Sequence, residues 1–388
     1  MKTRMKQLAI VLLALFLHAA CNNAKKDKDV IKIGAILPLT GDLSSYGVDT
    51  KLALELAVKQ KNNNGGINGK KVVLVIEDSK GQTKEASIAA NKLIIIDKVI
   101  AILGPITSPE VLVIAPICNK NKVPLISPSS TDNAISNAGE YVFRTINADN
   151  IETQAFAIFL KQDLNLPKIA IIANQATGTL SYATSFEEFY KKNGGTILNK
   201  EIFGENQIDF KNVIIKQLSS NPDAFYISGV SMEIGLLIKQ IREINKTVKI
   251  FSYQSAEDRR VVEIANEQVN GVVFSSTTLP DSIIGSARLN IVDDFMNEYG
   301  KKPGIFAAEI FDGINIIMNA LNNSNDSNKS FIEILKTTKD YNGASGIITF
   351  DVNGDVHKNI AIYQYLDMKP ILIATVTNNS IQKVAILK

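Results

Sequence analysis

Two hydroxyl-rich segments of the chain each follow a short apolar stretch with the character of a β-strand. Segment 107–110 (TSPE) comes after the predicted strand 99–103, and Ser108 is expected at the N-cap of a helix whose first turn holds a proline and a glutamate. Segment 127–132 (SPSSTD) follows the predicted strand 123–126 in the same way. Hydroxyls beside uncommitted helix N–H groups can hold an anionic group such as a carboxylate. The same residue types are also common caps and turns, so the pattern alone leaves both uses open.

Residues for nucleophilic or metal chemistry are scarce in this chain, which has two histidines and two cysteines among 388 residues. His18 and Cys21 belong to the N-terminal segment, which leaves His357 and Cys118, far apart in sequence. Cys118 lies in an apolar helical pattern (VLVIAPICNK) and is predicted to be a buried packing residue. Cys–His catalysis and multi-histidine zinc sites need more of these residues than remain. We therefore expect no enzyme activity, no metal and no cofactor.

Two glycine-containing segments look like ligand loops but lack the required spacing. In GGINGKK (65–71), the glycine spacing is one residue short of a phosphate loop, and Lys71 stands where Ser or Thr is needed. In DVNGD (351–355), the glycine falls two residues early for a calcium-binding EF-hand, and no glutamate follows at the right distance. Turns explain both segments better. The chain also has no glycine fingerprint of a dinucleotide-binding fold, which argues against a nucleotide-dependent enzyme.

Composition indicates a soluble globular protein of two domains. Hydrophobic residues make up 45% and charged residues 21%, and the formal net charge is only +3. The lysines are scattered, so there is no basic stripe for nucleic acid. A chain of 388 residues exceeds what one hydrophobic core usually supports.

From residue 30 onward, short apolar strands alternate with amphipathic helical patterns. The alternation runs through one set of elements up to about residue 126 and restarts with KIAIIA at 168–173. Strands that are apolar throughout are typical of parallel sheets covered on both faces by helices. The pattern therefore predicts an α/β protein of two similar lobes, each with a doubly wound parallel sheet made of right-handed βαβ units. Late strands are predicted at 347–350, 360–365 and 371–376.

The first residues have the layout of a secretory signal. Three basic residues open the chain: Lys2, Arg4 and Lys6. The apolar run Leu8–Leu17 is too short to span a bilayer, and His18-Ala19-Ala20 then lead to Cys21. This order resembles a bacterial lipobox, although His18 occupies the place of the usual leucine, and it predicts that residues 1–21 are a lipoprotein signal with Cys21 acylated. The alternative is a plain cleaved signal with a coincidental cysteine. The polar stretch 22–29 is expected to be a flexible tether.

Ordered matches over residues 30–366 resemble the branched-chain amino-acid (leucine/isoleucine/valine-type) substrate-binding proteins of ABC transporters. The matching segments are IKIGAILPLTGDLSSYG, GGINGKKVVLVIEDS, AANKLI, AILGPITSPE, VPLISPSSTDNAIS, YVFRTI, NPDAFYISG and GIITFDVNGD. The resemblance implies a type I periplasmic-binding fold, in which a three-crossover hinge joins two lobes that close on a ligand. It places lobe I at 30–149 and 280–350, and lobe II at 150–279 and 351–388.

The resemblance also assigns candidate ligand-binding residues in lobe I. The residues that match Ser108 and Thr131 hold the ligand carboxylate in the amino-acid binders. The residue that matches Ser129 offers its backbone carbonyl to the ligand ammonium, and Ser130 belongs to the same hydroxyl cluster. Tyr46, in the segment SSYG, matches an aromatic residue at the rim of the pocket.

Lobe II departs from the family pattern at its acidic residue. The acid that pairs with the ligand ammonium aligns with Gln254, in the segment SYQSAED. A neutral amide accepts a hydrogen bond but does not neutralise a buried cation, so selection for an α-ammonium is expected to be weaker. Glu257 or Asp258 could take its place, although both are more readily expected to face solvent.

The aromatic lid of lobe II is also absent. Its two positions align with Gly178 and Val230. Tyr182 and Tyr226 are candidates to replace them, but core or surface packing is the more common role of such residues. The carboxylate half of the expected pocket is thus kept while the ammonium half is altered, and the identity of the ligand stays open.

These features together predict an extracytoplasmic, lipid-anchored solute-binding protein of the cell envelope. Its expected partners are a small amino acid or related carboxylate or amide ligand, an ABC permease and a membrane reached only through the lipid anchor. The alternative is a ligand-sensing or cell-envelope regulatory lipoprotein on the same fold, because a fold does not settle function.

Overall fold

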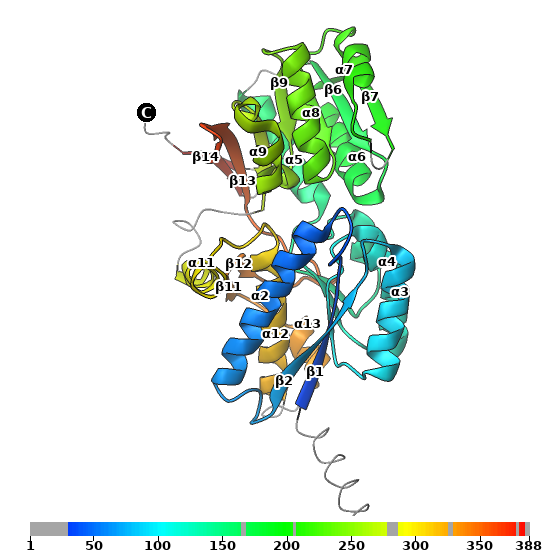
Figure 1. Ribbon diagram of the computed structural model, residues 1–388, viewed down its shortest axis with the longest axis vertical. Coiled ribbons are helices and arrows are strands. Elements are labelled where there is room, and N and C mark those ends of the chain that lie inside the picture. The colour runs from blue at the N-terminus through cyan, green and yellow to red at the C-terminus, as the bar shows by residue number, and fades with distance from the viewer. Residues whose placement is uncertain are drawn as a thin grey trace, which may run out of the picture.

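The computed structural model describes residues 30–163, 168–204, 207–277, 286–324, 329–377 and 380–384. The described chain forms two α/β lobes, stacked along the long axis of the molecule (Figure 1). The predicted signal, Cys21 and the tether lie outside the described residues.

Lobe I surrounds a five-stranded sheet in the order β2-β1-β3-β4-β5, in which every pairing is parallel. Its strands are β1 (Val30–Leu37), β2 (Lys71–Asp78), β3 (Ile102–Leu103), β4 (Leu125–Ser127) and β5 (Val142–Arg144). Its helical segments are α2 (Ser44–Asn63), α3 (Thr83–Asn91) with the π-helical turn η2 (Lys92–Ile96), α4 (Ser108–Asn121), the 3-10 turn η3 (Asn133–Asn137), α11 (Ser286–Tyr299), α12 (Ala307–Ser324) and α13 (Phe331–Lys336). A two-stranded hairpin, β11 (Tyr341–Gly343) and β12 (Gly346–Ile348), completes this lobe.

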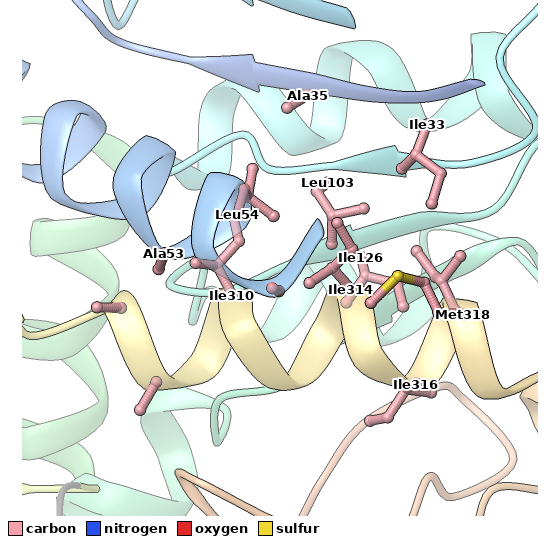
Figure 2. Packing of buried hydrophobic residues seen from close by; sticks show 14 of the residues in the cluster. Ile33, Ala35, Ala53, Leu54, Leu103, Ile126, Ile310, Ile314, Ile316 and Met318 are labelled. Carbon is pink, nitrogen blue, oxygen red and sulfur yellow. The ribbon is translucent and has the colours of Figure 1, made fainter. Parts of the chain in front are cut away.

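Two apolar layers cover the sheet of lobe I. Helices α2 and α12 bury one face, where Leu54 of α2 meets Ile310 and Ile314 of α12 beneath Leu103 of β3 (Figure 2). Helices α3 and α4 bury the other face, and Cys118 is fully enclosed there. The packing role predicted for Cys118 is confirmed, and burial raises the pKa of its thiol to about 12.

Lobe II surrounds an eight-stranded sheet in the order β15-β14-β13-β10-β9-β8-β6-β7. Its strands are β6 (Lys168–Asn174), β7 (Thr196–Phe203), β8 (Ala224–Ser228), β9 (Lys249–Ser252), β10 (Val273–Ser276), β13 (Ile360–Leu366), β14 (Lys369–Thr377) and β15 (Ser380–Lys383). Helices α5 (Asp149–Asp163) and α6 (Thr177–Lys192) cover one face. The other face carries α7 (Lys211–Leu218), α8 (Ser231–Ile244) and α9 (Arg259–Ala265), with the 3-10 turns η4 (Gln254–Glu257) and η5 (Asn266–Val269).

The two sheets repeat one topology. The order β7-β6-β8-β9-β10 in lobe II has the same pattern as β2-β1-β3-β4-β5 in lobe I. The chain passes between the lobes after β5, after β10 and after β12. The predicted fold class, two doubly wound α/β lobes with three crossovers, is confirmed. The boundaries at 149/150 and 350/351 stay predictions, and the one at 279/280 lies outside the described residues.

Several elements differ from the sequence-based expectation. The late strands β13, β14 and β15 add to lobe II in antiparallel fashion, so that sheet is mixed. Strand β3 has two residues instead of the five expected at 99–103. Helix α5 follows the first crossover without having been predicted, and its polar residues Asp149 and Glu152 are buried.

Candidate functional site

The carboxyl ends of the parallel strands of both lobes face each other, and the lobes are in contact there. The backbone N–H of Ser231, which opens α8, donates to the Tyr46 hydroxyl at 3.1 Å. The Asn133 amide donates to Ser185 Oγ of α6 at 3.4 Å. A Cβ on Gly178 would lie 3.4 Å from Ser108 Oγ. Open α/β sheets bind ligands at this end of the strands, beside the point where the strand order reverses.

Ser108 lies next to that reversal point, between β1 and β3, but it is not the helix cap. The cap is Thr107, whose N–H and hydroxyl both donate to the Glu110 carboxylate, at 3.3 and 2.6 Å. The expected N-cap was therefore wrong by one residue, because the capping box forms between Thr107 and Glu110. Ser108 Oγ instead accepts the backbone N–H of Asp132 at 3.3 Å. Its hydroxyl hydrogen has no acceptor among the described residues and can donate to a ligand.

The loop 127–132, called the hydroxyl loop below and grouped with segment 107–110 as the hydroxyl loops, is held against the segment that follows β3 by its own hydroxyls. Ser129 Oγ and Ser130 Oγ both donate to the Ile106 carbonyl, at 2.7 and 3.2 Å. The Thr131 hydroxyl and the Ser129 carbonyl make no hydrogen bond within the described part of the chain. The structure thus brings Ser108, Ser129 and Thr131 together. The Ser108 hydroxyl of segment 107–110 and the Thr131 hydroxyl of segment 127–132 can still bond a ligand.

A buried arginine supports this loop from behind. Arg144, at the end of β5, is 0% exposed, and its Nη1 donates to the carbonyls of Asp132 at 3.0 Å and Ser130 at 3.4 Å. Its Nε forms an ion pair with Asp355 at 2.6 Å. Gly354 lies in the third crossover between the lobes and lets it pass close to β5. Its φ is 79°, and a Cβ there would lie 2.4 Å from the Val142 carbonyl. Arg144 therefore ties the hydroxyl loop to the third crossover between the lobes.

Tyr46 lies in the first turns of α2, beside the end of β1. The neighbouring Gly47 allows this approach, because a Cβ there would lie 2.0 Å from the Pro38 carbonyl. The Tyr46 ring packs on Phe306 with centroids 5.4 Å apart, and burial raises the pKa of its hydroxyl. Tyr46 therefore bridges the lobes through Ser231 and does not stack on an open rim.

In lobe II, Gln254 is 5% exposed and lies directly after β9. Its Nε2 donates to the Tyr182 hydroxyl at 3.0 Å, and its Oε1 accepts from the Thr277 hydroxyl at 3.3 Å. The amide orientation is thereby fixed on both sides. The two aligned lid positions carry no aromatic ring, because they are Gly178 and Val230. Gly178 faces Ser108, and Val230 precedes α8.

Glu152 of α5 is a site residue that sequence reasoning missed. It is 0% exposed and accepts three hydrogen bonds, from Tyr182 Oη at 2.6 Å, Ser275 Oγ at 2.7 Å and the Gln254 N–H at 3.3 Å. Burial raises the pKa of the Glu152 carboxyl to about 7 despite these donors, and the charge of Asp149 adds to the rise. Burial also raises the pKa of Asp149, to about 6. No signal in the single sequence marks Glu152, because its contacts lie 30 to 123 residues away.

The other candidates of lobe II have structural roles. Tyr226 is enclosed in the core and stacks on Phe186 with centroids 3.8 Å apart. Asp258 caps α9 by accepting the Arg260 N–H at 2.8 Å, and it is buried, so the expectation that it faces solvent was wrong. Glu257 accepts from Ser276 at 2.6 Å.

The described residues contain no competing site near these groups. Within 30–384, gaps aside, no group of three or more His, Cys, Asp and Glu side chains could hold a metal ion. None of the helices in the described ranges is long and apolar enough to cross a membrane. A surface depression of about 440 Å³ shares no residue with the hydroxyl loops and is lined by Lys239, Ala265, Asn266, Glu267, Gln268 and Met368.

Two lobes of this strand order, in contact at their strand ends and joined by three crossovers, define the type I periplasmic-binding fold. The family model described as "Periplasmic binding protein" matches residues 30–369, so the chain belongs to that family. It is an extracytoplasmic solute-binding protein of the kind that serves ABC transporters.

Relatives and solved structures agree on the branched-chain class. The chain is 24% identical to Leu/Ile/Val-binding protein homolog 3 of Brucella melitensis, over 84% of this chain and 88% of that one. A leucine-binding protein of Thermotoga maritima has a TM-score of 0.84 at 28% identity, covering 90% of this chain and 99% of its own. The branched-chain amino-acid binding protein of Streptococcus pneumoniae in complex with isoleucine has a TM-score of 0.82 at 26% identity, covering 92% and 100%. The resemblance seen in the sequence is confirmed.

Proposed function

We propose that this protein captures a small carboxylate ligand, an amino acid or a close relative of one, between its lobes and delivers it to an ABC permease. The observation that carries the proposal is the pairing of Ser108 and Thr131 at the ends of adjacent parallel strands. Both are buried, and neither hydroxyl donates to an acceptor among the described residues. Two such hydroxyls beside the start of α4 form a natural site for a carboxylate.

The relatives support an amino-acid ligand but leave room for other carboxylates. The Thermotoga and Streptococcus proteins are described as binders of leucine and branched-chain amino acids. A Rhodopseudomonas palustris protein with the same fold, 17% identical and with a TM-score of 0.81, holds benzoate. Transport is favoured over a purely sensory role because the Streptococcus and Rhodopseudomonas proteins are described as binding proteins of transporters.

The test is a thermal-shift screen followed by calorimetry. Amino acids and amine-free carboxylates are screened on the protein that lacks residues 1–21, and a binder at 100 times its Kd stabilises it by about 2.7 kcal/mol. Loss of a hydrogen bond to a charged group costs about 1.5–3 kcal/mol, so Ser108→Ala and Thr131→Ala should weaken binding roughly tenfold to a hundredfold. Thr83→Ala, exposed on α3 of the same lobe, is the matched control. Unchanged affinity in both site variants would place the ligand elsewhere.

We also propose that the protein binds its ligand without converting it. The described residues hold one cysteine, Cys118, which is enclosed in the core of lobe I, and one histidine, His357, whose Nε2 lies 3.3 Å from the Asp351 carboxylate. Mass spectrometry of the ligand after incubation should recover it unchanged. Accumulation of a product that requires the folded protein would contradict this proposal.

A third part of the proposal concerns attachment to the membrane. The order of basic, apolar and small residues before Cys21 supports cleavage and acylation at that cysteine, with 22–29 as the tether. A fatty-acid probe should label the wild type in cells and leave Cys21→Ser unlabelled. Equal labelling of both would remove the anchor from the proposal and leave the solute-binding function intact.

A further inference from the structure

Glu152 is a buried carboxylate that has hydrogen-bond donors but no cation. All three donors, Tyr182, Ser275 and the Gln254 backbone, are neutral. Among the described residues, no lysine or arginine forms an ion pair with Glu152. Burying an ionised carboxylate without a compensating charge is costly, and hydrogen bonds offset only part of that cost. The site therefore lacks a positive group that would make the ionised form of Glu152 favourable.

One of the groups bonded to Glu152, Tyr182, lies on the side of α6 that contacts lobe I. Gly178, Tyr182 and Ser185 are spaced four and three residues apart on α6, so they lie on one side of that helix. Gly178 lies against Ser108, and Ser185 accepts from Asn133, which follows the hydroxyl loop. Tyr182 is between them on the same side, and its hydroxyl is the atom that joins Gln254 to Glu152. A chain of hydrogen bonds thus runs from Gln254 through Tyr182 to the buried carboxylate, and Tyr182 lies on the side of α6 that carries the interlobe contacts.

We propose that Glu152 supplies the negative charge by which lobe II selects an ammonium group on the ligand, acting through Tyr182 and Gln254. This inference rests on the proposed function, because it assumes a ligand carboxylate at Ser108 and Thr131. Glu152 is a positioning residue in this arrangement, since it is fully enclosed and the ammonium meets Gln254 and Tyr182 first.

The hydrogen-bond directions are those that an ammonium needs. Tyr182 donates its only hydrogen to Glu152, so its oxygen, which already accepts from Gln254 Nε2, can meet a ligand only as an acceptor. Gln254 turns its Nε2 toward Tyr182 and its Oε1 toward Thr277, and that carbonyl oxygen keeps a second lone pair. The carbonyl of Ser129 in lobe I is a third acceptor without a partner in the described residues. Three acceptor oxygens, with a carboxylate one bond behind that of Tyr182, suit a cation, whereas an apolar ligand end would leave the Ser129 carbonyl unpaired.

The pKa of Glu152 gives this arrangement a measurable consequence. With a pKa raised to about 7, the ligand-free carboxyl is largely protonated at pH 6 and largely ionised at pH 8. A ligand ammonium favours the ionised form, so binding at pH 6 should release a proton. Affinity for an ammonium-bearing ligand should then be about tenfold weaker at pH 6 than at pH 8.

The experiment must distinguish the titration of Glu152 from that of the other titratable groups around it. Tyr182 and Tyr226 face it from α6 and β8, Tyr253 lies against Tyr182, and burial raises the pKa of all three tyrosines well above this range. Asp149, one turn earlier on α5, titrates near pH 6 and lies near Arg144. Asp149→Asn is therefore a necessary companion variant.

The experiment compares Glu152→Gln with the wild type, using the amino acid that binds most tightly in the screen and the same molecule without its amine. Leucine and 4-methylpentanoate are the first such pair. Glu152→Gln keeps the side-chain size but removes the charge, and it should weaken binding of the amino acid at least tenfold at pH 8. Binding of the amine-free acid should change less than threefold. Calorimetry in two buffers of different ionisation enthalpy should detect proton release at pH 6 in the wild type and in Asp149→Asn but not in Glu152→Gln.

Glu188→Gln, exposed on α6, controls for the change in net charge and should behave as the wild type. Equal loss of both ligands in Glu152→Gln would mean that Glu152 only supports the fold, and the inference would be overturned. Binding of amine-free acids but of no amino acid would also overturn it while leaving the proposed function standing. If Ser108→Ala and Thr131→Ala bind both ligands normally, the proposed function fails independently of Glu152.

Discussion

The two halves of the proposed site use one topology for opposite chemistry. In lobe I, hydroxyls and backbone groups follow β3 and β4, and the buried charge behind them is the cation Arg144. In lobe II, Tyr182 and Gln254 are hydrogen-bonded to each other after β6 and β9, and the buried charge behind them is the carboxylate Glu152. The shared strand order positions the polar groups of each lobe. The sign of the buried charge behind them differs, because it comes from Arg144 in lobe I and from Glu152 in lobe II.

The two buried charges also differ in how they are balanced. Arg144 has its partner Asp355 within the fold and further acceptors in the carbonyls of the hydroxyl loop. Within the described part of the chain, Glu152 has only neutral donors. Lobe I is therefore complete before a ligand arrives, whereas lobe II reaches its best electrostatic state only with a cation present.

Removing the cation of lobe I should have the largest effect. Arg144→Met leaves Asp355 buried without its partner and frees two loop carbonyls, so unfolding free energy should fall by about 3–5 kcal/mol. Arg144→Lys keeps the charge but loses the planar donors, and it should cost less. Urea denaturation measures both variants. Lys336→Met, which breaks a pair whose side chains are 37% and 70% exposed, should cost at most about 1 kcal/mol. Equal costs for Arg144→Met and Lys336→Met would refute the role given to Arg144.

The uncompensated carboxylate of lobe II predicts a stability that falls as pH rises. The folded pKa of Glu152, about 7, lies above its ordinary value of 4.5, so its contribution is complete below pH 4.5 and is lost as pH rises through 7. The loss is about 3 kcal/mol between those limits. The raised pKa of Asp149 acts in the same direction. Urea denaturation of the ligand-free protein at pH 5 and 8 should therefore show a smaller decline in Glu152→Gln than in the wild type.

Ser108→Ala provides the comparison from lobe I. Ser108 does not ionise, so this variant should show the pH dependence of the wild type. A decline that is the same in all three proteins would mean that Glu152 does not titrate in this range.

Moving the carboxylate within lobe II should have a smaller effect. Because Gln254 aligns with the family's acid, the sequence alone predicts that Gln254→Glu tightens amino-acid binding if the ligand ammonium lies there, but the contacts of Glu152 change that expectation. Two carboxylates that share the Tyr182 hydroxyl tend to keep one proton between them, so the single change should alter affinity less than threefold at pH 7. The double variant Glu152→Gln/Gln254→Glu restores one carboxylate and should bind the amino acid about tenfold more tightly than Glu152→Gln, or about 1.4 kcal/mol. A tenfold gain from Gln254→Glu alone would contradict the assignment of Glu152.

The sequence predicted the fold because its signals are local. Apolar strands, helical periodicity and the capping residues around Thr107 and Glu110 each act within a few positions. Ordered matches to a known family then supplied the two-lobed architecture. The hydroxyl cluster of lobe I was also accessible, because Ser108 and the residues 129–131 directly follow their strands.

The chemistry of lobe II was not accessible from the sequence for a physical reason. Glu152 lies on a surface-like helical pattern, and only the packing of α5 under β10 and η4 buries it next to Gln254, 102 residues away. The off-by-one cap had a local cause, since Thr107 and Ser108 are both good caps and only the position of Glu110 decides between them. The sequence shows only that Gln254 is a neutral residue at the position of the family's acid. The carboxylate of Glu152 next to it becomes apparent only from burial and long-range pairing in the folded structure.

The smallest expected effect concerns the bond that joins the two halves. Tyr46→Phe keeps the ring on Phe306 and removes only the oxygen that accepts the Ser231 N–H. A net hydrogen bond contributes about 1 kcal/mol, and this one exists only while the lobes are in contact, so ligand affinity should fall about fivefold. The loss should be the same for an amino acid and for its amine-free analogue, because Tyr46 contributes to closure and to neither charge. Calorimetry on both ligands measures it, with Tyr299→Phe, whose hydroxyl donates to the Leu52 carbonyl within lobe I, as the control. A loss confined to the amino acid would instead make Tyr46 part of the ammonium site.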